Sequence, residues 1–322
     1  MKSMWKRVGL AVSVALTLAA CEPFEFDDGG GGTAGSAFSR GFVFVRESDR
    51  NVYALDDNGD KNSPLVLTRH GGVYQPAVSR NGLLVAYVYR SASTFELRTV
   101  PTTGQGQPST LLSSASLTGC TGCSNFSYPT FSPDGRTIVF TLSQNNRTLL
   151  ARVNTDASGF RLLTGGSSYV FGPASFMPDG RSVLAAAGSF AGQLNLLIQV
   201  NVDTGAESTA SFSLGNEALG VVSRLAVSPD GMKVAFDGRV SSGASRVFVG
   251  QFSGQQVQSF TQVTGDSGSS TYPSWRGNTE LGFLSDDGGS DNVYRISAAS
   301  VRGTGSLTLA VPGALEPSYG GF

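Results

Sequence analysis

A turn motif that recurs at intervals of roughly fifty residues limits the fold of this chain more than any other feature. Ser-Pro-Asp-Gly at 132–135 returns as Met-Pro-Asp-Gly at 177–180 and again as Ser-Pro-Asp-Gly at 228–231. Weaker copies stand at 79–82 and 275–278. Proline fixes φ, aspartate caps the turn locally and glycine accepts a positive φ, so the motif predicts a tight turn between strands. Four-stranded propeller blades repeat at this spacing.

Runs rich in β-branched and aromatic residues surround each turn in a constant order. An inner strand comes just before the turn, as at 129–131 and 273–275, and three further runs follow, bounded by Gly, Asn, Asp and Ser. The first of these runs lies at 83–88, 137–142, 182–187, 233–237 and 280–284. The second lies at 95–100, 148–154, 194–201, 245–252 and 292–296, and the third at 109–113, 160–164, 207–214, 259–264 and 306–311.

The two ends of the chain complete a sixth unit. Residues 42–45, 51–56 and 64–68 have the pattern of the second, third and fourth strands of a blade that lacks its first, and 316–321 has the pattern of an inner strand with nothing after it. Pairing the two ends would close the ring and remove exposed strand edges. An irregular β-sandwich would not require complementary termini. We therefore predict an all-β protein, a six-bladed propeller of four-stranded blades at 38–322 whose C-terminal strand closes the ring.

The best copies of the repeat lie at 128–140 and 224–236, where Pro-x-Phe-Ser-Pro-Asp-Gly-Arg or a variant of it precedes an apolar strand. This pattern resembles the repeat of TolB-like propellers, and its register extends from about residue 40 to the end. The family includes periplasmic scaffolds, accessory domains of peptidases and a few sugar lyases. The α/β domain of TolB and the hydrolase domain of the peptidases have no counterpart in this sequence. The resemblance therefore implies the fold and a bias toward protein binding. It does not imply that this chain has the cellular role of TolB itself.

Residues 1–20 have the pattern of a targeting segment. Basic residues within 2–7 precede a short apolar run at 8–17, which is too short to suggest a membrane span. The run ends in Leu-Ala-Ala-Cys, which resembles the lipobox of bacterial lipoproteins and implies cleavage before Cys21 and lipidation of its thiol. The alternative is an ordinary secretory signal with an incidental cysteine. Multiple acyl chains on Cys21 would anchor the protein stably to a membrane.

Residues 21–37 form a predicted tether, because acidic residues and a run of glycines leave little apolar surface to pack. Glu22 follows Cys21 where the inner-membrane retention signal of lipoproteins has aspartate, and in a two-membrane bacterium this favours the outer membrane. We expect an exported protein anchored through Cys21 that faces the periplasm or the cell surface.

Composition excludes one class of partner. The formal net charge is −1 and only 15% of the residues are charged, so no basic field exists to attract nucleic acid. The 42 glycines fit many short strands and tight turns. The expected partners are an envelope protein, a peptide or a glycan, and we expect a monomer.

Residues suited to catalysis are sparse. His70 is the only histidine, which argues against a histidine-based metal site or a catalytic triad. Gly-Asp-Ser-Gly at 265–268 has the letters of a serine-protease signature without its surroundings. The predicted inner strands contain no acidic residue, and only the loop residues Glu217 and Glu316 could reach the channel. We expect no cofactor and no metal; the alternative is a metal-dependent hydrolase or lyase with its site in the channel.

Two polar hairpins and one pair of cysteines also require interpretation. The segments at 56–60 and 286–291 alternate oxygen-bearing side chains, but the first lacks the glycine and glutamate of a calcium loop, so we interpret both as hairpins. Cys120 and Cys123 lie in the longest loop between blades, and export to an oxidising compartment favours a disulfide that staples this loop. A redox-active pair remains the alternative.

The remaining candidate site is the face at which the inner strands begin. Aromatic and arginine side chains around a concave mouth are typical of binding surfaces. Packing of the same aromatics between blades is the equally weighted alternative. The predicted ligand-binding residues are His70, Tyr74, Tyr128, Tyr169, Arg224, Tyr272 and Glu316. We expect a lipid-anchored binding or scaffold protein of the cell envelope that recognises its partner through this face.

Overall fold

Six four-stranded antiparallel sheets make up the computed structural model, which describes residues 38–322 except 191, 214–217 and 254–255. Each sheet is one blade, and blade 1 combines both ends of the chain. Blade 1 contains β24 (Ala314–Gly320), β1 (Gly41–Arg46), β2 (Val52–Asp56) and β3 (Leu65–Val66), and blade 2 contains β4 (Val73–Val78), β5 (Leu84–Arg90), β6 (Phe95–Pro101) and β7 (Ser109–Ser113). Blade 3 contains β8 (Ser124–Phe131), β9 (Thr137–Gln144), β10 (Arg147–Asn154) and β11 (Arg161–Leu162), and blade 4 contains β12 (Val170–Phe176), β13 (Ser182–Gly188), β14 (Leu196–Asn201) and β15 (Glu207–Ser213). Blade 5 contains β16 (Val221–Val227), β17 (Lys233–Arg239), β18 (Ser245–Ser253) and β19 (Gln256–Gln262), and blade 6 contains β20 (Ser270–Arg276), β21 (Glu280–Ser285), β22 (Asn292–Ser297) and β23 (Thr308–Pro312).

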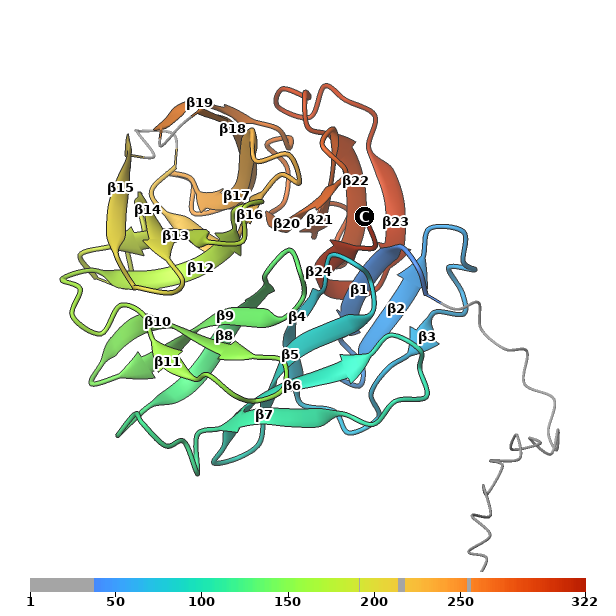
Figure 1. Cartoon of the computed structure of the whole chain (residues 1–322). Coiled ribbons are helices and arrows are strands. Elements are labelled where there is room, and N and C mark those ends of the chain that lie inside the picture. The colour runs from blue at the N-terminus through green and yellow to red at the C-terminus, as the bar shows by residue number, and fades with distance from the viewer. Residues whose placement is uncertain (1–37, 191, 214–217, 254–255) are drawn as a thin grey trace, which may run out of the picture. The chain divides into compact units, whose positions relative to one another are not determined.

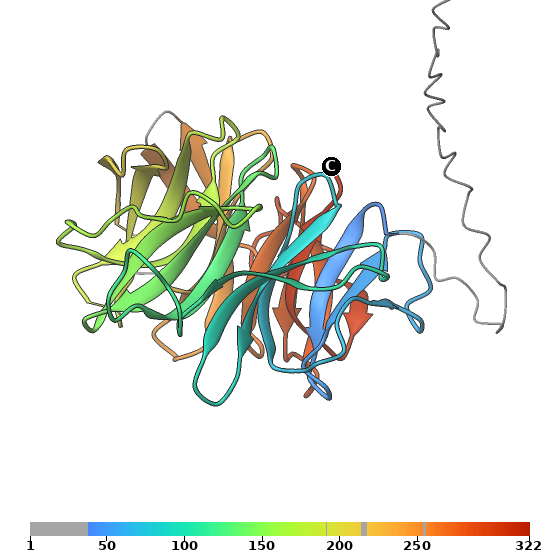
Figure 2. The ribbon, with the colours of Figure 1, turned by 60° about the horizontal axis from the view of Figure 1, so that its bottom comes forward.

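The inner strands of the six blades contact one another in a closed cycle. β4 contacts β8, and the contacts continue through β12, β16, β20 and β24 back to β4. Figure 1 shows the blades arranged around this common centre, and Figure 2 shows their twist from a second direction. Blades 2 and 5 therefore lie on opposite sides of the channel. The predicted six-bladed propeller is confirmed.

The last strand closes the ring. β24 pairs antiparallel with β1 from Gly41↔Gly320 to Arg46↔Ala314, so the blue and red ends of the chain lie side by side in Figure 1. This pairing gives β1 a hydrogen-bonded neighbour on each side, because β2 pairs with its other edge. The predicted closure by the C-terminal strand is confirmed, and it removes an edge that could pair with another chain.

The recurring turn between the first two strands of a blade is held by its own side chains. In blade 3 the Ser132 hydroxyl donates to Asp134 and accepts from the amide of Thr137, and Asp134 also accepts from the amide of Arg136. Gly135 has a φ of 71°, which glycine adopts without strain. The same bonds recur in blade 5, and in blade 2 an asparagine replaces the aspartate.

In three outer segments a threonine hydroxyl takes the place of a backbone carbonyl as acceptor, and two of these strands, β3 and β11, are shorter than the sequence predicts. The amide of Leu150 donates to the Thr164 hydroxyl rather than to a carbonyl, and β11 contains only Arg161–Leu162 of the predicted 160–164. Thr68 does the same beside the equally short β3. In blade 5 Thr264 accepts from Val247, and β19 ends before it.

The apolar core is divided among the six interfaces between neighbouring blades. Alternate residues of one strand face opposite neighbours, as expected of a sheet buried on both faces. In β9, Ile138 and Phe140 pack toward blade 2, whereas Val139 packs toward blade 4. This division holds each blade to both of its neighbours.

The described part of the chain contains no helix long and apolar enough to cross a bilayer. The predicted signal segment, Cys21 and the tether fall outside the described residues.

Candidate functional site

One residue of each inner strand occupies the same place in the repeat and faces the channel region. A proline follows every one of these residues except Arg224, which precedes Leu225. We call these six residues the channel ring: Gln75, Tyr128, Gly172, Arg224, Tyr272 and Glu316. They lie at the level where the ladder between the first two strands of a blade is interrupted by a bulge.

Four members of the channel ring have a left-handed backbone. The φ angles are 52° for Gln75, 54° for Tyr128, 52° for Tyr272 and 52° for Glu316. Such angles are uncommon for bulky residues and cost on the order of 1 kcal/mol each. Four repeats share the feature, so the fold maintains it systematically. A bulge of this kind changes the direction of a side chain and often lies beside a functional site.

Hydrogen bonds join the ring across blade boundaries. The amide of Gln75 donates to the Glu316 carboxylate, and the Gln75 side-chain oxygen accepts from the amide of Tyr128 at 2.9 Å. Arg224 extends from blade 5 to the opposite side of the channel, where Nη2 donates to the carbonyl of Pro76 at 3.0 Å. These bonds connect blades 1, 2, 3 and 5 at the level of the ring.

Blade 5 holds its bulge with a buried carboxylate. Asp237, on β17, accepts hydrogen bonds from the amides of Ser223 and Arg224 and from the Ser223 hydroxyl. Burial raises the pKa of Asp237 to about 6, although these hydrogen bonds oppose the shift. Asp237 is fully buried, so it supports the ring from behind.

The ring itself carries mixed charge. Burial raises the pKa of Glu316, against the effect of the Gln75 amide and of Arg50, Arg224 and Arg90. Burial also lowers the pKa of Arg224, against the nearby Tyr272, Glu316 and Asp237. The pKa values of both ring tyrosines are raised, chiefly by burial. The ring is therefore a desolvated environment in which a charge interacts strongly with its neighbours.

A layer of cation–π contacts covers the ring at the end where the inner strands begin, which we call the start end. The guanidinium carbons of Arg50 and Arg90 lie 5.0 and 4.5 Å from the centroid of Tyr74. Arg50 also lies 3.9 Å from the Glu316 carboxylate. Arginine over an aromatic face is favourable and orders both side chains.

A cavity of 160 Å³ extends from the ring toward the opposite end of the channel, which we call the turn end because the recurring turns lie there. Tyr128 and Arg224 line its closed end. Its walls are small or aromatic inner-strand residues, among them Trp275, whose ring nitrogen donates to the carbonyl of Ala226. Turn prolines and the exposed Phe322 line the mouth. The cavity can receive a group no larger than a side chain or a small acid.

The structure brings together four of the seven predicted ligand-binding residues and separates the others. Tyr128, Arg224, Tyr272 and Glu316 belong to the channel ring, and they are largely buried rather than arranged around an open mouth. Tyr74 precedes the ring residue Gln75 in the sequence, and its aromatic ring lies under Arg50 and Arg90.

The other two predicted residues lie elsewhere. His70 is exposed and contacts the Gly71 carbonyl and the Tyr87 hydroxyl. Tyr169 packs against the apolar core between blades 3 and 4.

The expectation that the inner strands contain no acid is wrong. Glu316, treated as a loop residue although it begins the predicted strand at 316–321, lies inside β24, because that strand starts at Ala314 and its bulge falls within it. Gln75 and Asp237 were missed. Alignment of the repeats on the residue before the proline would have found Gln75. Asp237 had one signal, an acid inside an otherwise apolar strand. Glu217 lies outside the described residues.

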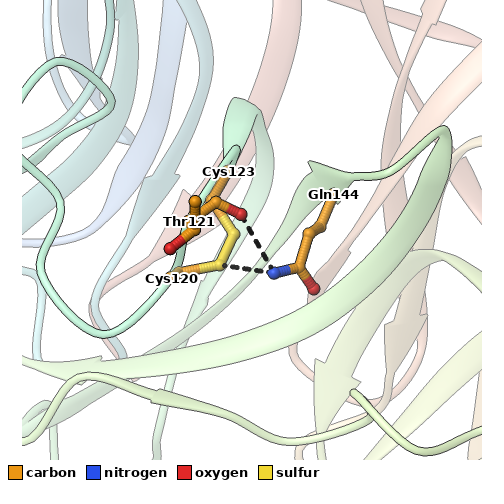
Figure 3. The surroundings of a disulfide bond; sticks show 4 residues. All are labelled: Cys120, Thr121, Cys123 and Gln144. Atoms are coloured by element: carbon orange, nitrogen blue, oxygen red, sulfur yellow. Dashed lines mark hydrogen bonds between the residues drawn. A yellow bond between two sulfur atoms is a disulfide. The ribbon is translucent and has the colours of Figure 1, made fainter.

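Cys120 and Cys123 are joined in a disulfide within the loop that precedes β8 (Figure 3). Both cysteines are buried, and the side-chain nitrogen of Gln144 donates to the Cys120 sulfur and to the Thr121 carbonyl (Figure 3). The hydrogen bonds from Gln144 therefore attach the disulfide-bonded loop to the end of β9.

In the two polar hairpins, at 56–60 and 286–291, carboxylates accept hydrogen bonds from backbone amides of the protein. Asp56 accepts from the amides of Ser39, Arg40 and Asn58, which hold its pKa at about 2 despite the opposing effect of burial. Asp286 accepts from the amide of Ser269. Within the described residues, no group of three or more His, Cys, Asp or Glu side chains is placed to hold a metal ion.

The serine of the Gly-Asp-Ser-Gly segment also has a local partner. The hydroxyl of Ser267 donates to Asp287. Asp266 accepts from Gln262 and pairs with Arg302. These contacts tie the segment to its neighbouring loops.

Comparison with known families identifies the repeat. Residues 50–315 match the family described as the lipoprotein LpqB β-propeller domain. The chain belongs to this family. The LpqB propeller match includes every member of the channel ring except Glu316, which follows it directly. No curated protein matches the chain.

Solved structures show how widely this LpqB-type propeller fold is shared. TolB from Acinetobacter baumannii is similar with a TM-score of 0.64 and 19% identity, over 87% of this chain and 66% of that chain. A chain of the nidogen/laminin complex is similar with a TM-score of 0.62 and 12% identity, over 87% and 98%. Oligogalacturonate lyase from Vibrio parahaemolyticus is similar with a TM-score of 0.51 and 14% identity, over 80% and 74%. Identities this low show the fold alone, and this chain spans about two thirds of the A. baumannii TolB chain.

Proposed function

We propose that this chain is a lipid-anchored protein of the cell envelope that binds or scaffolds a protein, peptide or glycan partner through the propeller channel. The cavity between the channel ring and the turn end of the channel is the observation that supports the proposal. It combines a closed end with arginine and tyrosine, small walls and an apolar mouth. A concave, mainly apolar site with a few convergent polar groups is the usual form of a binding site. The membership in a lipoprotein propeller family supports the envelope location.

A capture experiment tests the binding role. The full chain, purified in detergent, serves as bait in an envelope extract, and captured molecules are identified by mass spectrometry. Thr130 lines the cavity, and Thr130→Phe would fill part of it. Met232 is exposed beside a turn of blade 5 and does not line the cavity, so Met232→Gln is the matched control. We expect a partner that Met232→Gln retains and Thr130→Phe loses. A partner retained equally by both variants would contradict recognition through the channel.

The anchor has its own test. Cys21→Ser should move the protein from the membrane fraction to the aqueous fraction and remove the acyl mass from its N-terminus. Retention of the variant in the membrane fraction would contradict anchoring through Cys21.

A metal-dependent envelope hydrolase or lyase is the second candidate function, because two carboxyl groups have raised pKa values, that of the ring residue Glu316 and that of Asp237 behind the ring. Perturbed carboxylates beside a cavity are typical of functional sites. Metal analysis of the purified full chain separates the two functions. Stoichiometric calcium or manganese that is lost in Asp237→Asn would favour the enzyme, and metal-free protein that still captures its partner would favour the binding role.

A further inference from the structure

Arg224 is a largely buried cation, and among the described residues it has no close counter-ion. It forms no salt bridge with any carboxylate of the residues that the structure describes. Its guanidinium donates to the Pro76 carbonyl, and its carbon lies 5.8 Å from the centroid of Tyr272. A guanidinium has five N–H donors, so within the described part of the chain most of its donors have no protein acceptor.

Among the described residues, the two carboxylates nearest to Arg224 form hydrogen bonds or ion pairs with groups other than its guanidinium. Asp237 accepts from Ser223 and from the backbone amide of Arg224, not from its guanidinium. Glu316 accepts from Gln75 and pairs with Arg50. Burial raises the pKa of both carboxyl groups, against the hydrogen bonds that each accepts. A desolvated charge is costly unless it is paired, so this site favours an added anion.

The cavity gives such an anion a defined place. Arg224 lines its closed end, and the mouth lies at the other end beside Phe322. The volume of 160 Å³ is close to that of an engineered cavity that admits benzene, about 150 Å³. Apolar side chains such as Phe131, Phe176 and Trp275 line the walls. A second arginine, Arg80, and several serine side chains also line the cavity. Arg224 therefore makes one end of the site cationic, and the aromatic wall residues suit a small apolar body beside it.

We propose that the channel cavity binds a single carboxylate-bearing apolar group, with its carboxylate paired to Arg224. A planar guanidinium matches a carboxylate and can bind it through two hydrogen bonds. This proposal rests on the proposed binding function, whose ligand class it specifies. The same chemistry could come from a free aromatic or aliphatic acid or from the C-terminal residue of a peptide.

Trp275 provides a direct optical probe of occupancy. The chain has two tryptophans, Trp5 and Trp275, and Trp275 lines the cavity. In full-length Trp5→Phe protein, Trp275 fluorescence therefore reports on the cavity alone. Benzoate should change this fluorescence saturably, and benzyl alcohol, which has the same ring without the charge, should bind about tenfold more weakly or worse. Equal affinity for the two probes would overturn the proposal.

Two leucine variants separate the site from general charge. Arg224→Leu should weaken benzoate at least about tenfold while leaving benzyl alcohol within about twofold. Arg181 is an exposed arginine that does not line the cavity, so Arg181→Leu should leave both affinities unchanged. Arg224→Leu should also be as heat-stable as the parent or more so, because it removes an unpaired buried charge. Benzoate affinity unaffected by Arg224→Leu, with the variant folded by circular dichroism, would overturn the proposal.

Two further probes identify the source of the carboxylate. A short peptide with a free C-terminal phenylalanine is compared with its C-terminal amide and with benzoate. Binding of the free peptide but not the amide supports a peptide C-terminus, and binding of benzoate alone supports a free acid. If the capture experiment finds a channel-dependent partner but neither carboxylate probe binds, the binding function stands and this inference fails.

Discussion

The side chain of Arg224 crosses the propeller channel and donates a hydrogen bond to the carbonyl of Pro76, on the blade directly opposite. The two residues are 148 positions apart in the chain. Their contact separates the channel into a start end, covered by Arg50, Tyr74 and Arg90, and a turn end that contains the cavity. A ligand can therefore reach Arg224 from the turn end, the end opposite to the one that the aromatic residues in the sequence suggested.

The closing strand should contribute strongly to stability. Tyr319 is buried on β24, packs edge-on against Phe42 and donates to Asp57. Tyr319→Ala should lower the free energy of unfolding by about 3 kcal/mol or more, because it leaves a cavity at the seam. Phe322, three residues later, is exposed, so Phe322→Ala should cost less than about 1 kcal/mol. Denaturant unfolding measures both, and equal costs would contradict a seam held by β24.

The turn serine should matter through its hydroxyl. Ser132→Ala removes a donor to Asp134 and an acceptor for Thr137, and we expect a loss of about 1 kcal/mol in the free energy of unfolding. Ser168 is exposed and outside any strand, so Ser168→Ala should stay within about 0.5 kcal/mol of the parent. Thermal unfolding of the two variants tests the difference. A neutral Ser132→Ala would mean that Pro133 and Gly135 alone determine the turn.

Stability should depend on pH through Asp237. Burial raises its pKa from the ordinary 3.8 to about 6, so the folded protein holds this proton more tightly than the unfolded chain does. Its contribution to stability is fully present below about pH 4 and is lost as the pH rises through about 6. Asp237→Asn cannot ionise, so relative to the parent it should gain roughly 1–3 kcal/mol across this window.

Urea unfolding at several pH values between about 4 and 7 measures this difference for Asp237→Asn. The pKa of Glu316 is raised in the same direction, so some slope of the same sign should remain in the variant. A parent and variant with parallel pH profiles would show that Asp237 titrates normally in the folded protein.

The disulfide should stabilise the loop before β8 modestly. Cys120 and Cys123 are three positions apart and close a small loop, for which the chain-entropy model gives about 2 kcal/mol. A reductant should therefore lower the unfolding midpoint of the parent and leave the Cys120→Ala/Cys123→Ala variant unchanged. A reductant effect of equal size in both proteins would assign the change to something other than this bond.

The strands were predictable from the sequence because their causes are local, and the closure was predictable because the two ends of the chain complete one repeat. A turn such as that at Ser132 is specified by four adjacent residues, and the alternation of Ile138, Val139 and Phe140 follows directly from strand geometry. The outer strands β3 and β11 were predicted too long, since no strand pattern reveals that a threonine hydroxyl such as that of Thr164 replaces a ladder carbonyl. The closing strand begins at Ala314, two residues before the predicted start at Glu316, because its pairing extends to Arg46 at the other end of the chain.

The candidate site was only partly predictable, for a different physical reason. Residue types indicated Tyr128, Arg224 and Tyr272, but the bonds that place them join distant parts of the chain. Gln75 meets Glu316 across 241 positions, and Asp237 reaches the ring through backbone amides that carry no side-chain signature. That Arg224 has no salt bridge to a described carboxylate is likewise a property of three dimensions, because Asp230 and Asp237 lie near it in the sequence.

The pairing of β1 with β24 also determines when folding of the propeller can be completed. During synthesis, a nascent chain that ends at Pro312 already contains five blades and three strands of the first, yet the inner edge of β1 still has no partner. The first ordered segment must wait for the last to emerge before its hydrogen bonds are complete. Loss of this one strand would thus leave β1 with an unpaired edge that can pair with another chain and promote aggregation.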